Sequence, residues 1–133
     1  MKIVIHTMYY LPDFGSAPIL MDELARALAA SGHDVEVVTT LPRTRGEEFR
    51  GLFFSRRVEG RVVVKRLWTN RAASPLARLL AWNIYTAGAL VNLLAVRRGD
   101  VLFLRTPPLQ LGVPAFFAKA LGGARVVVNV QDI

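Results

Sequence analysis

The chain has 133 residues, no cysteine and a hydrophobic fraction of 53%. This length fits one domain, the apolar fraction argues against disorder, and the lack of cysteine excludes a disulfide framework and a thiolate metal site. The net charge is +7, and the segment from Arg43 to Arg78, with ten basic and three acidic residues, accounts for all of it. Such a block indicates an anionic partner, such as a phosphate or a membrane surface, or else an arginine-rich solvated surface.

The first third of the chain has the pattern that opens a βαβ sheet. We expect a strand at 2–6, a loop at 7–18, a helix that Ser16 caps and Gly32 ends, and a strand at 35–39. Because the strand at 2–6 starts at once after Met1, no signal peptide is expected.

The middle of the chain is less regular. Residues 41–60 mix arginine, glycine and phenylalanine and form the least regular stretch, whereas 61–68 is a candidate strand around its three valines. Ser74 is predicted to cap a long helix with Pro75 at its first position, running to about Val96.

The segment 76–96 is also long enough to invite a membrane interpretation. Arg78, Asn83 and Asn92 interrupt its apolar run, and such groups are costly in hydrocarbon. A helix packed against a sheet explains the pattern more simply, and a helix at the membrane interface stays open as the alternative.

The last third returns to alternating strands and helices. We expect a strand at 100–106, a helix at 109–121 and a buried parallel strand in 124–133, centred on 125–130. With about five strands and helices between them, the chain predicts an α/β fold: a Rossmann-like, doubly wound, mainly parallel sheet.

Ligands of such sheets bind beyond the carboxyl ends of the strands. Gly15 and Ser16 follow the first strand, where a glycine and a helix N-terminus can receive a phosphate or a sugar. The repeated glycines of a dinucleotide fingerprint are missing, and Thr39 stands where that fingerprint needs an acid. A turn glycine with an ordinary helix cap remains the plain alternative.

Gln131 and Asp132 follow the last strand, at the same edge of the sheet. Asp132 is a candidate to accept a proton or bind a sugar hydroxyl, although a lone carboxylate is also a common turn cap. His6 is more often a core residue than a catalyst, and His33 is expected on the surface. No cluster has the spacing of a metal site.

Several segments together carry a resemblance to a family. The order of elements resembles the amino-terminal domain of family-4 glycosyltransferases, especially bacterial members that build colanic acid, O-antigen and related polysaccharides. The segments are Tyr9-Tyr-Leu-Pro-x-x-Gly15, Gly32-His-Asp-Val-Glu-Val-Val-Thr39, Thr106-Pro-Pro108 and Val128-Asn-Val-Gln-Asp-Ile133.

The resemblance implies one half of a GT-B fold, in which two Rossmann-like domains face a cleft. It implies that 1–133 is an apparently truncated acceptor-side domain, that the donor-binding carboxyl-terminal domain is absent, and that the fragment alone is inactive. The complete enzyme would be retaining and metal-independent, without a cofactor. It would move a sugar from a nucleotide-diphosphate donor to a lipid-linked or polysaccharide acceptor. A cytoplasmic location is implied, with contact at the inner face of the membrane.

The resemblance also assigns residues. Gly15 and Ser16 match the glycine-rich loop near the donor phosphates, although relatives often have a second glycine at position 16. Thr106 matches a cleft-facing position. Gln131 stands where many relatives carry histidine, so a histidine role does not transfer, and Asp132 stays the candidate for sugar or acceptor contacts.

Other functions remain in view. Arginines beside Phe53, Phe54 or Trp68 fit an anionic membrane. The alternative from another class is a stand-alone basic Rossmann-like module that binds membrane or nucleic acid, although no nucleic-acid partner is expected for a glycosyltransferase.

Overall fold

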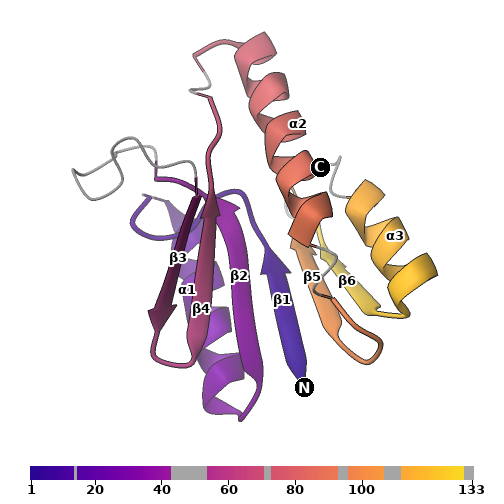
Figure 1. Ribbon diagram of the computed structural model, residues 1–133. Coiled ribbons are helices and arrows are strands. Elements are labelled where there is room, and N and C mark those ends of the chain that lie inside the picture. Colours follow the sequence, from indigo (N-terminus) through magenta and orange to yellow (C-terminus); the bar gives the residue numbers. More distant parts are fainter. Residues whose placement is uncertain (14, 43–53, 71–72, 93–95, 107–111, 131–133) are drawn as a thin grey trace.

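The computed structural model describes residues 1–13, 15–42, 54–70, 73–92, 96–106 and 112–130. Within these residues, six strands form one sheet in the order β3-β4-β2-β1-β5-β6, with helices on both faces (Figure 1). The elements are β1 (Lys2–His6), α1 (Ser16–Ala30), β2 (Asp34–Thr40), β3 (Phe54–Glu59), β4 (Val62–Leu67), α2 (Pro75–Asn92), β5 (Val101–Arg105), α3 (Gly112–Gly122) and β6 (Arg125–Asn129). The expected Rossmann-like α/β fold is confirmed.

The two faces of the sheet carry separate cores. Successive residues of a strand point to opposite faces, so Ile3 and Ile5 of β1 join the cluster under α1, whereas Val4 joins the cluster under α2 and α3. All paired strands are parallel except β3, which runs antiparallel to β4 at one edge. This parallel arrangement brings the carboxyl ends of β1, β2, β4, β5 and β6 to the same end of the molecule.

Helix α2 packs on the sheet through Ala81, Tyr85 and Ala89, which are buried. The Tyr85 hydroxyl donates a hydrogen bond to the Val38 carbonyl oxygen at 2.6 Å, which joins the helix to β2. The expected cap is present, because the Ala77 amide donates to the Ser74 hydroxyl at 3.1 Å. Among the helices of the described residues, none is long and apolar enough to cross a membrane.

Two features differ from the sequence expectations. Strand β3 lies in the stretch expected to be irregular. Helix α2 is described to Asn92, and whether it continues toward Val96 stays a prediction, because residues 93–95 lie outside the described residues. The last strand is expected to be buried, but β6 is an edge strand whose Val127 and Val128 are about half exposed. Its outer edge has no neighbouring strand within the described residues, which explains the exposure.

A charged ladder crosses the face that carries α2. Glu36 of β2 is buried and pairs with Lys65 of β4 at 2.9 Å and with Lys2 of β1 at 3.8 Å. Two ammonium groups therefore compensate one carboxylate at the centre of the sheet.

Candidate active site

The sheet has a switch point between β1 and β5. The two strands are neighbours, with His6 opposite Leu104. After β1 the chain passes to α1 on one face, and after β5 it passes to α3 on the other face (Figure 1). The crevice where a doubly wound sheet reverses its winding is the usual ligand site of such folds. Gly15, Ser16 and Thr106 all follow these two strands, so the topology places them at the same edge.

The loop between β1 and α1 is tied to the sheet. The hydroxyl groups of Thr39 and Thr40 donate to the Met8 carbonyl oxygen at 3.2 and 2.7 Å. The Thr7 amide donates to the Val38 carbonyl oxygen at 3.1 Å, and the Thr7 hydroxyl donates to the Tyr9 carbonyl oxygen at 3.0 Å. Because these bonds fix the backbone, the loop presents the start of α1 in one arrangement, which is the preorganisation that a binding site needs.

Gly15 is the cap residue directly before α1. Its φ of 126° and ψ of 170° belong to a region that is essentially restricted to glycine. A Cβ at this position would meet only ordinary contact with Pro18, so the requirement comes from the backbone conformation and not from lack of space. The helix cap is therefore Gly15 rather than the expected Ser16, and no side chain caps this end.

The amino end of α1 is open to a ligand. Gly15 and Ser16 are exposed, and the first turn of the helix contains no acidic residue. The first amide groups of a helix lack partners within it and carry partial positive charge. Helix ends of this kind often receive a phosphate, and a contact of Gly15 and Ser16 with a phosphate or a sugar stays a prediction.

Arg66 supports the same loop from β4. Its guanidinium donates to the Leu11 carbonyl oxygen at 2.5 Å and lies 5.9 Å from the centre of the Tyr10 ring. Arg66 is buried, and its burial lowers the pKa of the guanidinium. The side chain therefore fixes the loop rather than offering a solvated charge.

Tyr10 links the loop to the middle of α1. Its hydroxyl donates to Asp22 Oδ1 at 2.8 Å, while Asp22 Oδ2 pairs with Arg26 at 2.9 Å. Burial, followed by the hydrogen bond to Asp22, raises the pKa of Tyr10 above its usual range. A hollow of about 800 Å³ lies between this part of α1 and the β3–β4 turn. Since both oxygens of Asp22 have partners, its carboxylate serves to hold the loop.

His6 ends β1 beneath the switch point. It is fully buried, and neither ring nitrogen has a hydrogen-bond partner among the described residues. Burial lowers the pKa of this imidazole to about 4. His6 is therefore a neutral core residue at neutral pH, as the sequence favours, but its hydrogen-bonding groups are not satisfied.

Thr106 follows β5 and is buried. Its amide donates to the Asn129 carbonyl oxygen at 3.1 Å, and its hydroxyl donates to the same oxygen at 3.4 Å. These bonds hold the carboxyl ends of β5 and β6 together. A contact between Thr106 and a sugar stays a prediction.

The other two candidate positions, Gln131 and Asp132, lie outside the described residues. Within the described part of the chain, no three histidine, cysteine, aspartate or glutamate residues are grouped as a metal site. The sequence did not indicate the residues that hold the loop between β1 and α1 in place, which are Thr39, Thr40, Tyr10, Asp22 and Arg66.

Comparison with known proteins gives consistent matches along the chain. The family described as "Glycosyl transferase 4-like domain" matches residues 17–133. A protein of Escherichia coli (strain K12), "Putative colanic acid biosynthesis glycosyl transferase WcaI", is 30% identical over 140 residues. That match covers 99% of this chain and 34% of the relative.

Two solved structures share the fold. The first, the catalytic domain of starch synthase IV from Arabidopsis thaliana bound to ADP and acarbose, matches with a TM-score of 0.69 and 14% identity. This match covers 98% of this chain and 34% of the starch synthase chain. The second, described as "Trehalose-6-phosphate from E. coli bound with UDP-2-fluoro glucose", matches with a TM-score of 0.57 and 10% identity, covering 96% of this chain and 32% of that chain. The chain thus spans about a third of the length of each of these proteins.

Proposed function

Because the chain belongs to the glycosyl transferase 4-like domain family, we propose that it is the acceptor-side part of a retaining glycosyltransferase for cell-surface polysaccharide. The enzyme moves a sugar from a nucleotide-diphosphate donor to a lipid-linked or polysaccharide acceptor. The observation that carries this proposal is the similarity to the colanic acid glycosyl transferase along 99% of the chain. The ADP and UDP-2-fluoro glucose in the two similar structures support a nucleotide-sugar as the donor class.

The start of α1 has the chemistry for the leaving group. When the bond between the sugar and the diphosphate breaks, negative charge develops on the phosphate oxygen. Fixed amide groups near Gly15 and Ser16 stabilise such charge without reorganising, because the loop before them is already tied down. Asp132, Gln131 and Thr106 are the proposed contacts to the sugar or acceptor.

The remaining two thirds of the relatives' length is proposed to supply the donor-binding domain. On this proposal the 133-residue chain alone is inactive, and the complete enzyme needs no metal or other cofactor. It works in the cytoplasm at the inner face of the membrane, where a lipid-linked acceptor is available.

The test is a transfer assay on the full-length gene product with a panel of radiolabelled nucleotide-sugars and a polyprenyl-diphosphate-linked acceptor. The matched variants are Gly15→Ala and Gly32→Ala, which strain opposite ends of α1 because both glycines have positive φ, 126° and 92°. A strain of about 1–3 kcal/mol at Gly15 displaces the phosphate-facing backbone, so kcat/KM falls by roughly tenfold or more.

Gly32→Ala is expected to lower stability but to leave kcat/KM of the folded protein unchanged. Equal kcat/KM values for Gly15→Ala and Gly32→Ala would mean that the amino end of α1 is not part of the site. Absence of transfer with every donor, together with salt-sensitive binding of unrelated DNA, would instead support a stand-alone basic binding module.

A further inference from the structure

The hollow of about 800 Å³ beside α1 lies away from the switch point of the sheet. One wall is a strip of the helix with Asp22, Arg26, Ala29 and Ala30, whose spacing places them on the same side of it. The facing wall is the β3–β4 turn, residues 59–62. We name this space the hairpin hollow. Figure 1 shows the turn and the last turn of α1 at the end of the molecule opposite the carboxyl ends of the parallel strands. A volume of this size is typical of small-molecule sites.

The hairpin hollow stays open because the residues between its walls are small. Ala29 and Ala30 on the helix and Gly60 in the turn do not reach across the space. In the described part of the chain, no residue of β3 belongs to the buried cluster under α1. The helix therefore leaves the β3 edge of the sheet uncovered, and the space beside it is bordered by side chains but not filled.

The charged groups around the hairpin hollow balance but are only partly paired. Asp22 is held by the Tyr10 hydroxyl and by Arg26. Glu59 and Arg61 are exposed, and their side chains make no hydrogen bond or ion pair with another described residue. The hydrogen bond with Asp22 chiefly, and the charge of Glu59 to a smaller extent, raise the pKa of Arg26, so Glu59 lies within electrostatic range of that guanidinium. The lining thus offers an open acceptor and open donors, with two carboxylates against two guanidinium groups.

This balance selects an uncharged ligand that is rich in hydroxyl groups. A hydroxyl both donates and accepts hydrogen bonds, so neighbouring hydroxyls of one sugar ring can serve a carboxylate and a guanidinium at once. An anion that is attracted by Arg61 is repelled by Glu59, and a cation meets the reverse. Ala29, Ala30 and Val62 supply the apolar part of the lining, which suits the C–H faces of sugar rings.

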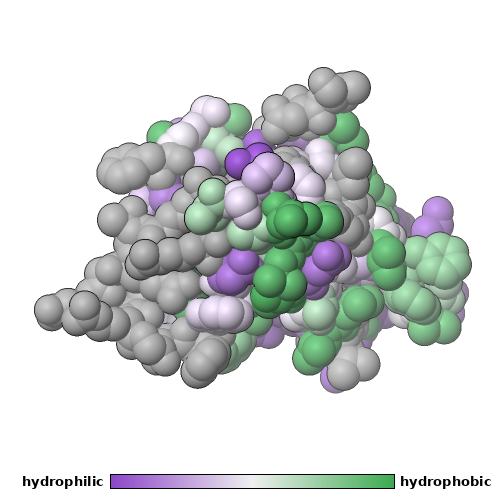
Figure 2. All heavy atoms as spheres, turned by 90° about the horizontal axis from the view of Figure 1, so that it is seen from above, coloured by the Kyte–Doolittle hydropathy of each residue, from purple (hydrophilic) through white to green (hydrophobic). Residues whose placement is uncertain are grey.

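We propose that the hairpin hollow binds a segment of an uncharged oligosaccharide. Glu59 accepts hydrogen bonds from the sugar hydroxyls, and Arg61 and the outer nitrogens of Arg26 donate to them. Figure 2 views the opposite end of the molecule, which carries the switch point, so the hairpin hollow is separate from the candidate active site. The binding itself does not depend on the proposed function. A polysaccharide acceptor held at this second point would stay near the enzyme between transfers, a consequence that does rest on the proposed function.

The test is a titration of the isotope-labelled chain with maltotetraose and with cellotetraose, followed through its amide signals by two-dimensional NMR. We expect saturable shifts at Ala30 and Gly60 and none at Ser16. Ala30→Trp places an indole in the hairpin hollow and abolishes the saturable shift at Gly60. The matched variant is Ala27→Trp, which adds the same side chain at an exposed position of α1 outside the lining and keeps the shift.

A second pair of variants tests the hydrogen bonds at constant change of charge. Arg61→Ala lowers the affinity for the oligosaccharide by roughly fivefold or more, because a charged donor is lost. Arg56→Ala removes the same charge from an exposed position of β3 outside the lining and leaves the affinity unchanged. Both side chains are exposed, so both variants are expected to fold.

Three results would overturn the assignment. The first is no saturable shift at Gly60 with either oligosaccharide at millimolar concentration. The second is an equal loss of affinity in Arg61→Ala and Arg56→Ala. The third is tighter binding of inorganic phosphate or of glycine betaine than of either oligosaccharide, which would give the hairpin hollow to an anion or to a zwitterion. None of these solutions contains a nucleotide-sugar, so the outcome is independent of whether the full-length gene product transfers a sugar.

Discussion

At the scale of single residues, His6 is the group whose burial has the clearest thermodynamic consequence. It lies fully inside the protein, with no partner for its ring nitrogens in the described structure. A protonated imidazole at this position would be an uncompensated buried charge. Burial therefore favours the neutral form and lowers the pKa to about 4 from an ordinary value of 6.5.

This shift predicts how stability depends on pH. Well above pH 6.5, His6 is neutral in both the folded and the unfolded chain, so it does not make the free energy of unfolding depend on pH. Between pH 6.5 and 4 the unfolded chain binds a proton that the folded chain does not, so the free energy of unfolding falls as the pH falls, by up to about 3 kcal/mol.

Urea unfolding of the wild type and of His6→Leu, measured from pH 7.5 to 4, checks this prediction. The variant is expected to lose that part of the pH dependence, and His33→Gln, which changes the other histidine, is expected to keep it. A His6→Leu profile parallel to the wild type would show that other groups cause the acid sensitivity.

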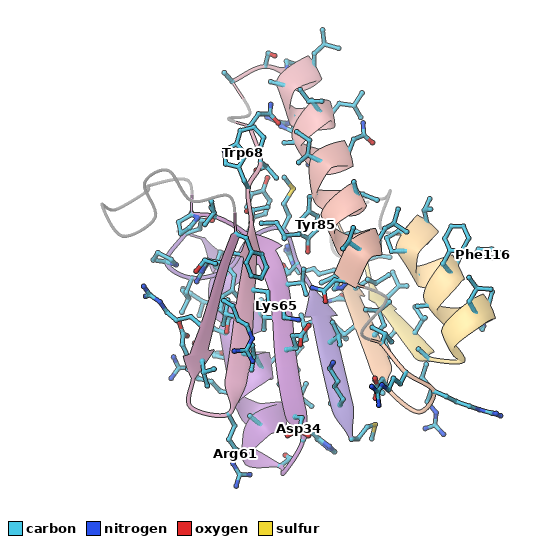
Figure 3. The ribbon with its side chains drawn as sticks, viewed as in Figure 1. Asp34, Arg61, Lys65, Trp68, Tyr85 and Phe116 are labelled. Carbon is cyan, nitrogen blue, oxygen red and sulfur yellow. The ribbon has the colours of Figure 1, made fainter. Side chains whose placement is uncertain are left out.

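The described basic residues of the segment from Arg43 to Arg78 do not form a single surface. Arg66 is buried under the loop, Lys65 pairs with Glu36, and Arg57 and Arg61 are exposed on and beside β3. Sequence order does not indicate this division, because the partner of Arg66 is the carbonyl group of Leu11, 55 residues earlier. Figure 3 shows Lys65 on the sheet and Arg61 near the opposite end of the molecule from Trp68.

At the scale of elements, the start of α2 depends on its cap. The hydrogen bond from the Ala77 amide to Ser74 satisfies one of the first helical amides. Ser74→Ala is expected to lower the free energy of unfolding by about 1 kcal/mol, while Ser74→Asp retains the cap. Urea midpoints measure the effect, and an unchanged midpoint in Ser74→Ala would mean that the first turn contributes nothing to stability.

The elements with strong patterns were predictable, and those without were not. Strands β1, β2, β4 and β5 are apolar runs with valine, isoleucine or leucine, and the structure places them within one or two residues of expectation. Strand β3, with the sequence Phe54-Ser-Arg-Arg-Val-Glu59, is an exposed edge and so has no apolar alternation. Its pairing with β4 is a tertiary contact that local sequence does not contain.

The sequence predicts the edge of the sheet that carries the candidate residues, but not the contacts that hold the loop there. The order of strands and helices implies that Gly15, Ser16 and Thr106 follow the carboxyl ends of β1 and β5, and the topology has this order, while their role in a site stays a prediction. The hydrogen bonds that fix the loop come from Thr39, Thr40 and Arg66 on other strands. No spacing in the sequence signals such contacts between distant segments.

At the scale of the whole molecule, β6 forms an edge of the sheet. Val127 and Val128 are exposed by 46% and 52%, and an apolar edge strand is a template for pairing with another chain. We expect the 133-residue chain to self-associate as its concentration rises, as measured by sedimentation velocity.

Val128→Lys is expected to reduce this association, because a charge on an edge strand opposes pairing. The control is Val113→Lys, which places the same charge on α3 at a valine with a similar exposed fraction of 49%. Equal loss of association in both variants would attribute the effect to net charge rather than to the strand edge.

The ladder of Lys2, Glu36 and Lys65 also bears on how the chain avoids misfolding. Neighbouring residues of a strand face opposite sides, so sliding β1 or β4 by one position would drive a lysine into the apolar layer beneath α1 and remove one of the two counter-ions of Glu36. Valine-rich strands alone would tolerate several alignments. The three charges therefore disfavour one-residue shifts of these strands and help to fix the register of the sheet.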